Sequence, residues 1–249
     1  RGLGDVYKRQ LFAIAKELSA AGANTAFEQI DLAVGLPPEH YGMLKERFAQ
    51  YFRRFGTVNF AYNNRPMSIV IRNVFVYPQA YAAVVPQSGQ LLKTLRMFIA
   101  DIGGYTTDVL LLRNGKPDLQ FCRSLESGVI TMNNDIIGKI SAQHDMRIED
   151  EHICAVLQGQ ETILPEEVKK AIRDAAQLHA KDILGKLREL QVDLRTNPAI
   201  FIGGGSVLFR PLIEHTSLVA KATFIDDPKA NAIGYEMLAR GQMAMRAVQ

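Results

Sequence analysis

Apolar positions recur along the chain with helical spacing in some stretches and strand spacing in others, which predicts an α/β fold. In 165–190 the residues Ile172, Ala176, Ile183 and Leu187 fall on one stripe, with lysines and arginines among the polar positions, as in an amphipathic helix. Helices are expected at 11–23, 38–54, 129–142, 165–190, 206–215 and 229–243, with a short helix after Pro78. The stretch 165–190 is expected to form one long helix or two. Strands are expected at 30–36, 57–61, 67–77, 97–100, 109–112, 119–125, 199–202 and 222–225.

Two glycine loops interrupt this pattern directly after apolar runs. The segment 101–108, Asp-Ile-Gly-Gly-Tyr-Thr-Thr-Asp, is predicted to form the turn of a buried β-hairpin. The segment 202–206, Ile-Gly-Gly-Gly-Ser, reads as the end of a strand, a glycine turn and the start of a helix. A helix start offers free N–H groups and a positive dipole end to an anionic or polar ligand. Each loop taken alone also fits a structural turn.

Composition and charge exclude several classes of protein. The chain has 249 residues, of which 47% are hydrophobic and 22% charged, so it can bury a core and is neither disordered nor fibrous. A net charge of +3 gives no basic surface for nucleic acid or lipid. The basic cluster Lys45, Arg47, Arg53 and Arg54 is interpreted as the solvated face of a helix rather than a nucleic-acid patch.

The cysteines and histidines give no sign of a metal site or a nucleophilic centre. Cys122 and Cys154 lack the spacing of metal ligands and are expected to be reduced thiols in the cytoplasm. The five histidines form no cluster or triad spacing with an activated Ser or Cys. No apolar stretch reaches the roughly twenty residues that cross a bilayer, so no membrane association is expected.

In their order and separation, the two glycine loops resemble the second phosphate motif and the adenosine motif of the actin, sugar-kinase and heat-shock-chaperone ATPase superfamily. The resemblance is strongest to the bacterial actin-like plasmid-segregation ATPases of the ParM/StbA group, and it extends over about residues 28 to 240. Four further segments support it: 30–37, 74–83, 127–129 and the closing pattern Pro-x-x-Ala-Asn-x-x-Gly-Tyr at 228–235. It implies an actin-like (ribonuclease H-like) two-domain ATPase fold.

The family's first phosphate loop has no counterpart before residue 28, so the chain is interpreted as N-terminally truncated. Residues 1–10 resemble a non-native leader left by a sequencing adapter, the alternative being a genuine polar tail. The expected domains are the C-terminal part of domain I at 11–96, a complete domain II at 97–230, and a C-terminal helix at 231–249. ATP binding by this fragment is expected to be weak, and hydrolysis absent.

The resemblance assigns roles within the first loop. Asp101 would hold Mg²⁺, through a bound water. Gly103 and Gly104 would let backbone N–H groups approach the β- and γ-phosphates, and the Thr106 hydroxyl would donate another hydrogen bond. Asp108 would accept a hydrogen bond from the attacking water or from the missing loop, or would only stabilise the hairpin.

The second loop and the strand end at residue 78 receive roles in the same way. Gly203, Gly204 and Gly205 would form a flat floor under the adenosine, and Ser206 is grouped with them as a nucleotide-binding residue. Gln79 would position the water that attacks the γ-phosphate, since phosphoryl transfer depends mainly on positioning and charge stabilisation. The alternative for Gln79 is an ordinary helix-start residue after a proline.

The function implied by the resemblance is a filament-forming ATPase. ATP would favour self-association into filaments, hydrolysis would favour disassembly, and a separate DNA-binding adaptor would connect the filament to plasmid DNA. The alternatives are a non-polymerising ATP-binding scaffold and a small-molecule kinase of the same superfamily.

Overall fold

The computed structural model describes residues 3–22, 27–53, 56–87 and 94–247, with backbone alone at the start of the first helix. The chain divides into two compact units. Unit 1 comprises Arg1–Val34 and Leu44–Val76, and unit 2 comprises Gly35–Met43 and Tyr77–Gln249.

Unit 1 is built on a small sheet in the order β1-β3-β2. Its elements are α1 (Leu3–Ala20), β1 (Phe27–Leu36), α2 (Pro38–Arg53), β2 (Thr57–Tyr62) and β3 (Arg65–Pro78), with β1 and α2 running on into unit 2. The β2–β3 hairpin turns at Asn63 and Asn64, whose φ angles of 49° and 60° are those of a two-residue turn suited to the twist of paired strands. Phe52 and Ala49 of α2 pack with Val74 of β3 in the small core of this unit.

Unit 2 contains a mixed sheet in the order β6-β5-β4-β7-β8. Its strands are β4 (Arg96–Ile102), β5 (Thr107–Arg113), β6 (Lys116–Leu125), β7 (Ala199–Ile202) and β8 (Ala222–Phe224). Strand β4 is antiparallel to β5 and parallel to β7, with Asp101 opposite Ile202. Because parallel strands end at the same edge, the two glycine loops lie side by side there.

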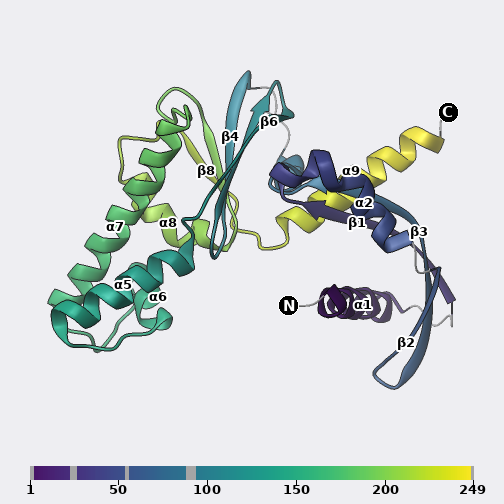
Figure 1. The fold of residues 1–249 in the computed structure, drawn as a ribbon, viewed down its shortest axis with the longest axis horizontal. Helices are drawn as coiled ribbons and strands as arrows, with labels where there is room; N and C mark the ends of the chain where they lie inside the picture. Colours follow the sequence, from purple (N-terminus) through teal and green to yellow (C-terminus); the bar gives the residue numbers. More distant parts are fainter. Residues whose placement is uncertain (1–2, 23–26, 54–55, 88–93, 248–249) are drawn as a thin grey trace. The chain divides into compact units, whose positions relative to one another are not determined.

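Both faces of this sheet are covered (Figure 1). On one face, Phe98, Leu111 and Phe201 pack with four helices; the helices are α5 (Val129–His144), α6 (Asp150–Leu157), α7 (Glu166–Glu189) and α8 (Gly204–Glu214). On the other, Ile99 and Leu110 pack with residues of α3 (Tyr81–Val84) and of α9 (Ala230–Ala247). The short 3₁₀ helix η1 (Val85–Gln87) follows α3 directly.

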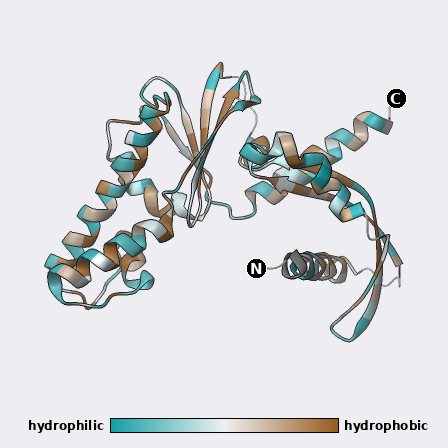
Figure 2. Cartoon of the chain, viewed as in Figure 1, coloured by the Kyte–Doolittle hydropathy of each residue, from teal (hydrophilic) through white to brown (hydrophobic). Residues whose placement is uncertain are grey.

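The long helix α7 has the stripe that the sequence predicts. Ile172, Ala176 and Leu187 are buried, whereas Lys181 and Arg188 are exposed. Figure 2 shows hydrophobic and hydrophilic residues alternating along this helix. The amphipathic pattern therefore fixes which side of α7 faces the sheet.

The predicted helices and strands are found, with ends that differ by a few residues. The first helix is the exception: it begins at Leu3 rather than at residue 11, inside the segment expected to be a leader. The short helix α6 was not expected. Its N-terminus carries a capping box formed by Glu149 and His152, in which His152 takes the place of the usual Glu or Gln. None of the helices in the described ranges is both long and apolar enough to span a membrane.

Candidate functional site

Asp101 lies at the end of β4, directly opposite Asp108 on β5. The turn between them is closed by a hydrogen bond of 2.8 Å from the Gly103 N–H to the Thr106 carbonyl. Burial, and secondarily the charge of Asp108, raises the pKa of Asp101 to about 6. A carboxylate whose ionised form is disfavoured in this way gains from a bound cation, so Asp101 fits the part of a Mg²⁺-linked group.

The first glycine loop is attached to the start of α5. The Val129 and Ile130 N–H groups donate to the carbonyls of Gly103 and Gly104 over 3.1 and 2.7 Å. Gly128 lies so close to these carbonyls that an added Cβ would overlap the Gly103–Gly104 backbone. The loop and the first turn of α5 therefore form one packed unit.

The residues of the turn differ in whether their polar groups are hydrogen-bonded within the protein. The Gly103 N–H is used inside the turn, whereas the Gly104 N–H has no acceptor in the described part of the chain. The Thr107 hydroxyl is buried and donates to the Ser127 carbonyl over 2.6 Å, so it stabilises the loop from behind. Thr106 is half-buried. The backbone thus leaves Gly104 better suited than Gly103 to donate to a phosphate.

The second glycine loop packs against the first. Gly203 has φ +87°, and a Cβ there would overlap the carboxylate of Asp101, which places the two loops in contact. A Cβ on Gly205 would overlap Ile102 and Val129, whereas Gly204 is exposed with open space around it. Two of these glycines are therefore required by packing, and Gly204 is the one that a ligand can reach.

Ser206 is fully buried, and its hydroxyl donates to the Gly203 carbonyl over 2.8 Å. The hydroxyl is thus occupied in holding the glycine turn. Its predicted contact with a nucleotide stays a prediction, which would require this hydrogen bond to be exchanged.

Gln79 follows β3 at the start of a strained turn. Its N–H donates to the Leu36 carbonyl over 2.8 Å, and its own carbonyl accepts from the Tyr81 N–H over 2.6 Å. The residue enclosed, Ala80, has φ 63° and ψ −52°, the geometry of a γ-turn that is rarely adopted by residues with a Cβ. The side chain of Gln79 is half-buried.

Tyr235 of the closing pattern packs beside Gln79 and lies within the electrostatic range of Asp101, and sequence reasoning gave it no role. Its hydroxyl lies against the backbone of Gly35, where the Gln79 side chain also packs. Its ring stacks on Tyr77 at 6.5 Å between centroids. Burial raises the pKa of Tyr235, and the charge of Asp101 raises it further. The only sequence signal for this role was the closing pattern itself.

Lys186 of α7 was also missed. Its ammonium group donates to the Ser127 hydroxyl over 3.2 Å and pairs with Asp182 at 2.7 Å. It brings a positive charge next to the turn that supports the first loop. In the sequence it is indistinguishable from the other basic residues of the polar face of α7.

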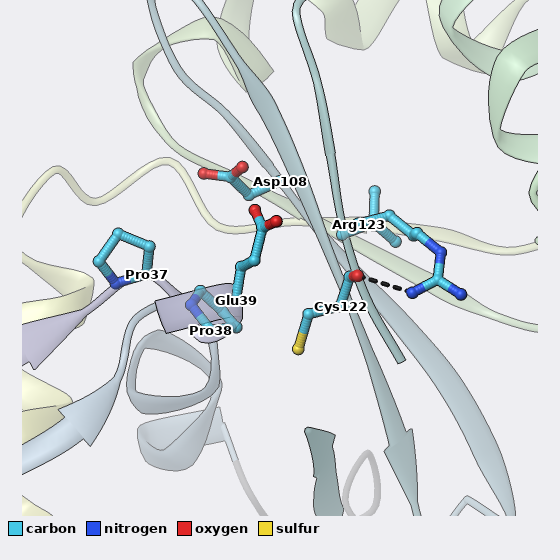
Figure 3. Close-up of a pocket in the computed structure, with 7 residues that line it drawn as sticks. Pro37, Pro38, Glu39, Asp108, Cys122 and Arg123 are labelled. Carbon is cyan, nitrogen blue, oxygen red and sulfur yellow. Dashed lines mark hydrogen bonds between the residues drawn. The ribbon is translucent and has the colours of Figure 1, made fainter. Parts of the chain in front are cut away.

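Asp108 also lines a small pocket with Glu39 and Cys122, whose cavity volume of about 10 Å³ is close to that of a single water molecule (Figure 3). Pro37, Pro38, Val109 and Arg123 complete it, and its volume is below the range of typical small-molecule sites. Burial is the main cause that raises the pKa of Cys122 to about 11, so its thiol stays protonated near neutral pH. The pocket is too small for a nucleotide.

No group of three His, Cys, Asp or Glu side chains within the described ranges could hold a metal ion by itself. Mg²⁺ commonly uses one or two carboxylates, with waters and substrate phosphates as its other ligands. Asp101 with Asp108 opposite therefore fits such a cation only together with a phosphate ligand.

Two family models match the sequence in successive parts. A model described as the N-terminal domain of actin-like proteins matches residues 3–81. A model described as the C-terminal part of archaeal actin homologues, MreB-like, matches residues 99–215, and this range contains both glycine loops. The chain is an actin-like protein.

Solved structures of similar fold agree with this assignment. The archaeal actin homologue Ta0583 gives a TM-score of 0.71 at 21% identity, covering 92% of this chain and 74% of its own. The Alp12 filament structure gives 0.69 at 14% identity, covering 93% and 74%. Bacillus thuringiensis ParM with ATP gives 0.63 at 12% identity, covering 94% and 73%. No curated protein matches the sequence of this actin-like protein. These identities establish a shared fold.

Proposed function

We propose that this actin-like protein binds ATP with Mg²⁺ and hydrolyses it as part of a filament that segregates plasmid DNA through a DNA-binding adaptor. One observation carries the proposal: both glycine loops meet at one edge of the unit 2 sheet, with the Asp101 carboxylate against Gly203. In this proposal, the first turn binds the phosphates and the adjoining glycine loop carries the nucleoside. The similar structures of a ParM with ATP and of an Alp12 filament support the nucleotide and the self-association.

In this proposal, Asp101 and the two glycine loops bind different parts of the nucleotide. Asp101 would hold Mg²⁺ through water, and the cation would neutralise charge on the phosphates. The Gly104 N–H, with Gly103 and Thr106 in the same turn, would donate to phosphate oxygens. Gly204 would lie under the adenosine, on a floor completed by Gly203, Gly205 and Ser206.

Gln79 would orient the attacking water, and Asp108 would accept a hydrogen bond near it. An amide is too weak a base to remove a proton, but orientation alone contributes strongly to phosphoryl transfer. Gln79 packs beside Tyr235, and the charge of Asp101 raises the pKa of the same tyrosine, which supports the proposal that the water and the metal share one centre.

The proposal is tested by phosphate release from Mg²⁺-ATP in the full-length protein. Asp101→Ala should lower turnover by about a hundredfold, in line with the loss of a group that stabilises transition-state charge. Asp118→Ala is the matched control, since this half-buried carboxylate on β6 is distant in the fold from the glycine loops and, in the described part of the chain, pairs with Arg113 and nearby backbone. Turnover of Asp101→Ala within about twofold of the control would refute the metal assignment.

Gly204→Leu tests the adenosine floor independently. Because the position is exposed with open space, the substitution should leave folding intact and weaken ATP binding by about tenfold or more, with or without Mg²⁺. Isothermal titration calorimetry measures this, with Gly138→Leu as a control at another open glycine. Equal ATP affinity for Gly204→Leu and the parent would contradict the assignment of Gly204 to the adenosine site.

A further inference from the structure

The first turns of α9 hold the segment 79–82 through three different contacts. The Asn231 side-chain oxygen accepts a hydrogen bond from the Ala80 N–H over 3.0 Å. Gly234 lies so close to the Ala82 carbonyl that a Cβ there would overlap it. Tyr235 packs on Gly35 beside the Gln79 side chain. One face of one helix thus contacts Gln79, the residue expected to orient water, together with Ala80 and Ala82.

The contact of Asn231 falls on the most strained residue of that segment. Ala80 is buried, and its φ of 63° is unfavourable for a residue with a Cβ. In such a turn the Ala80 N–H points away from the hydrogen bond between Gln79 and Tyr81, so it needs a separate acceptor. Asn231 supplies that acceptor, and so stabilises a backbone conformation that would otherwise relax.

The conformation of Ala80 fixes the direction in which Gln79 leaves the end of β3. The backbone of Gln79 is held on one side by the Leu36 carbonyl and on the other by the Tyr81 N–H. If the γ-turn opened, the peptide between Gln79 and Ala80 would rotate and the amide of Gln79 would move with it. A displacement of about 1 Å in a positioning group can cost about a hundredfold in rate.

We propose that Asn231, assisted by Tyr235, is a positioning residue for hydrolysis: it holds the Ala80 γ-turn and thereby aims the Gln79 amide at the attacking water. The proposal rests on the proposed function, in which Gln79 orients that water. It adds a role for the closing pattern in turnover, beyond attaching a helix. Nucleotide affinity should depend little on this contact, since Asn231 belongs to neither glycine loop.

The test compares three variants of the full-length protein. Asn231→Ala removes the acceptor, Asn231→Asp keeps an oxygen at the same place, and Gln242→Ala is the control. Gln242 lies on the same helix and accepts a similar hydrogen bond, from Tyr77 over 3.0 Å, but away from Gln79. Turnover should fall about tenfold or more in Asn231→Ala, with the ATP dissociation constant within about twofold of the parent. Asn231→Asp should recover most of the loss, and Gln242→Ala should match the parent.

Amide hydrogen exchange at Ala80, measured without nucleotide, gives a second readout. Exchange at Ala80 should accelerate about tenfold or more in Asn231→Ala and stay slow in Asn231→Asp and Gln242→Ala. Equal turnover in Asn231→Ala and Gln242→Ala, no recovery in Asn231→Asp, or unchanged exchange at Ala80 would each overturn the inference. A parent that releases no phosphate would instead refute the proposed function, and the exchange measurement would still decide whether Asn231 holds the turn.

Discussion

At the scale of single residues, Asp101 is a carboxyl group in a position that disfavours its ionised form. Burial and the facing Asp108 raise the pKa of Asp101 to about 6, so its ionisation above that pH costs stability in the absence of a cation. The folded protein binds a proton at Asp101 more tightly than the unfolded chain does. The contribution of protonated Asp101 to the free energy of unfolding is therefore present at low pH and is lost as pH rises from about 4 to about 6.

Asp101→Asn should consequently stabilise the nucleotide-free protein at pH 8 by about 1 to 3 kcal/mol, because it removes a buried charge. The gain should shrink as pH falls through about 6 and vanish near pH 4. Urea unfolding at a series of pH values measures it. Asp118→Asn should change stability in the opposite direction, since Arg113 lowers the pKa of Asp118. A destabilised Asp101→Asn at pH 8 would contradict the assigned electrostatics.

The chemistry of this edge could be predicted from residue types, but the separate roles of neighbouring residues could not. The sequence placed Asp101 and the glycines in loops because of the apolar runs beside them. It could not distinguish Gly204, which is open, from Gly203 and Gly205, which are packed, since this depends on atoms from β4 and α5. The use of the Ser206 hydroxyl inside the loop was hidden for the same reason.

At the scale of elements, the first residues of two helices come within backbone distance of the first glycine loop and of α3. Gly128 brings α5 against the Gly103–Gly104 carbonyls, and Gly234 brings α9 against the Ala82 carbonyl. Helices usually pack about 8–10 Å apart through side chains, so approaches this close require glycine. Such a close approach fixes the position of the helix relative to the backbone that it contacts.

Gly128→Ala should therefore destabilise the protein by about 1 to 3 kcal/mol, because neither the α5 start nor the loop backbone can yield without losing hydrogen bonds. It should also weaken nucleotide binding. Gly138→Ala, in the interior of the same helix with no neighbour to meet, should stabilise by up to about 1 kcal/mol. Denaturant unfolding and calorimetry separate the two; a neutral Gly128→Ala would show that the approach is not tight.

The type and place of most elements followed from periodicity, whereas their pairing did not. Hydrophobic spacing was enough for α7 and for the β4–β5 hairpin. The contact of α9 with the segment 79–82 joins parts of the chain more than a hundred residues apart, and no local pattern specifies it. The prediction missed α6 because its eight residues are too few to show a helical period of hydrophobic positions.

At the scale of the whole molecule, the proposed function links turnover to assembly. If Gln79 only orients water, Gln79→Ala should slow hydrolysis in the full-length protein while ATP-induced assembly persists. Filaments should then last several times longer than those of the parent in light-scattering traces after ATP addition. Gln242→Ala should disassemble like the parent. Rapid disassembly of Gln79→Ala filaments, or a parent that neither scatters nor pellets with Mg²⁺-ATP, would contradict the link.

The parallel pairing of β4 with β7 also bears on how the protein is made. Phe98 pairs with Ala199, and α5, α6 and α7 are synthesised between the two strands. Closing so long a loop is entropically costly and tends to make folding slow. While the ribosome is still translating the intervening helices, the edge of β4 has no strand to pair with and is open to other nascent chains. Ligand binding cannot begin until that pairing is complete, so translation speed across α7 should influence the yield of competent protein.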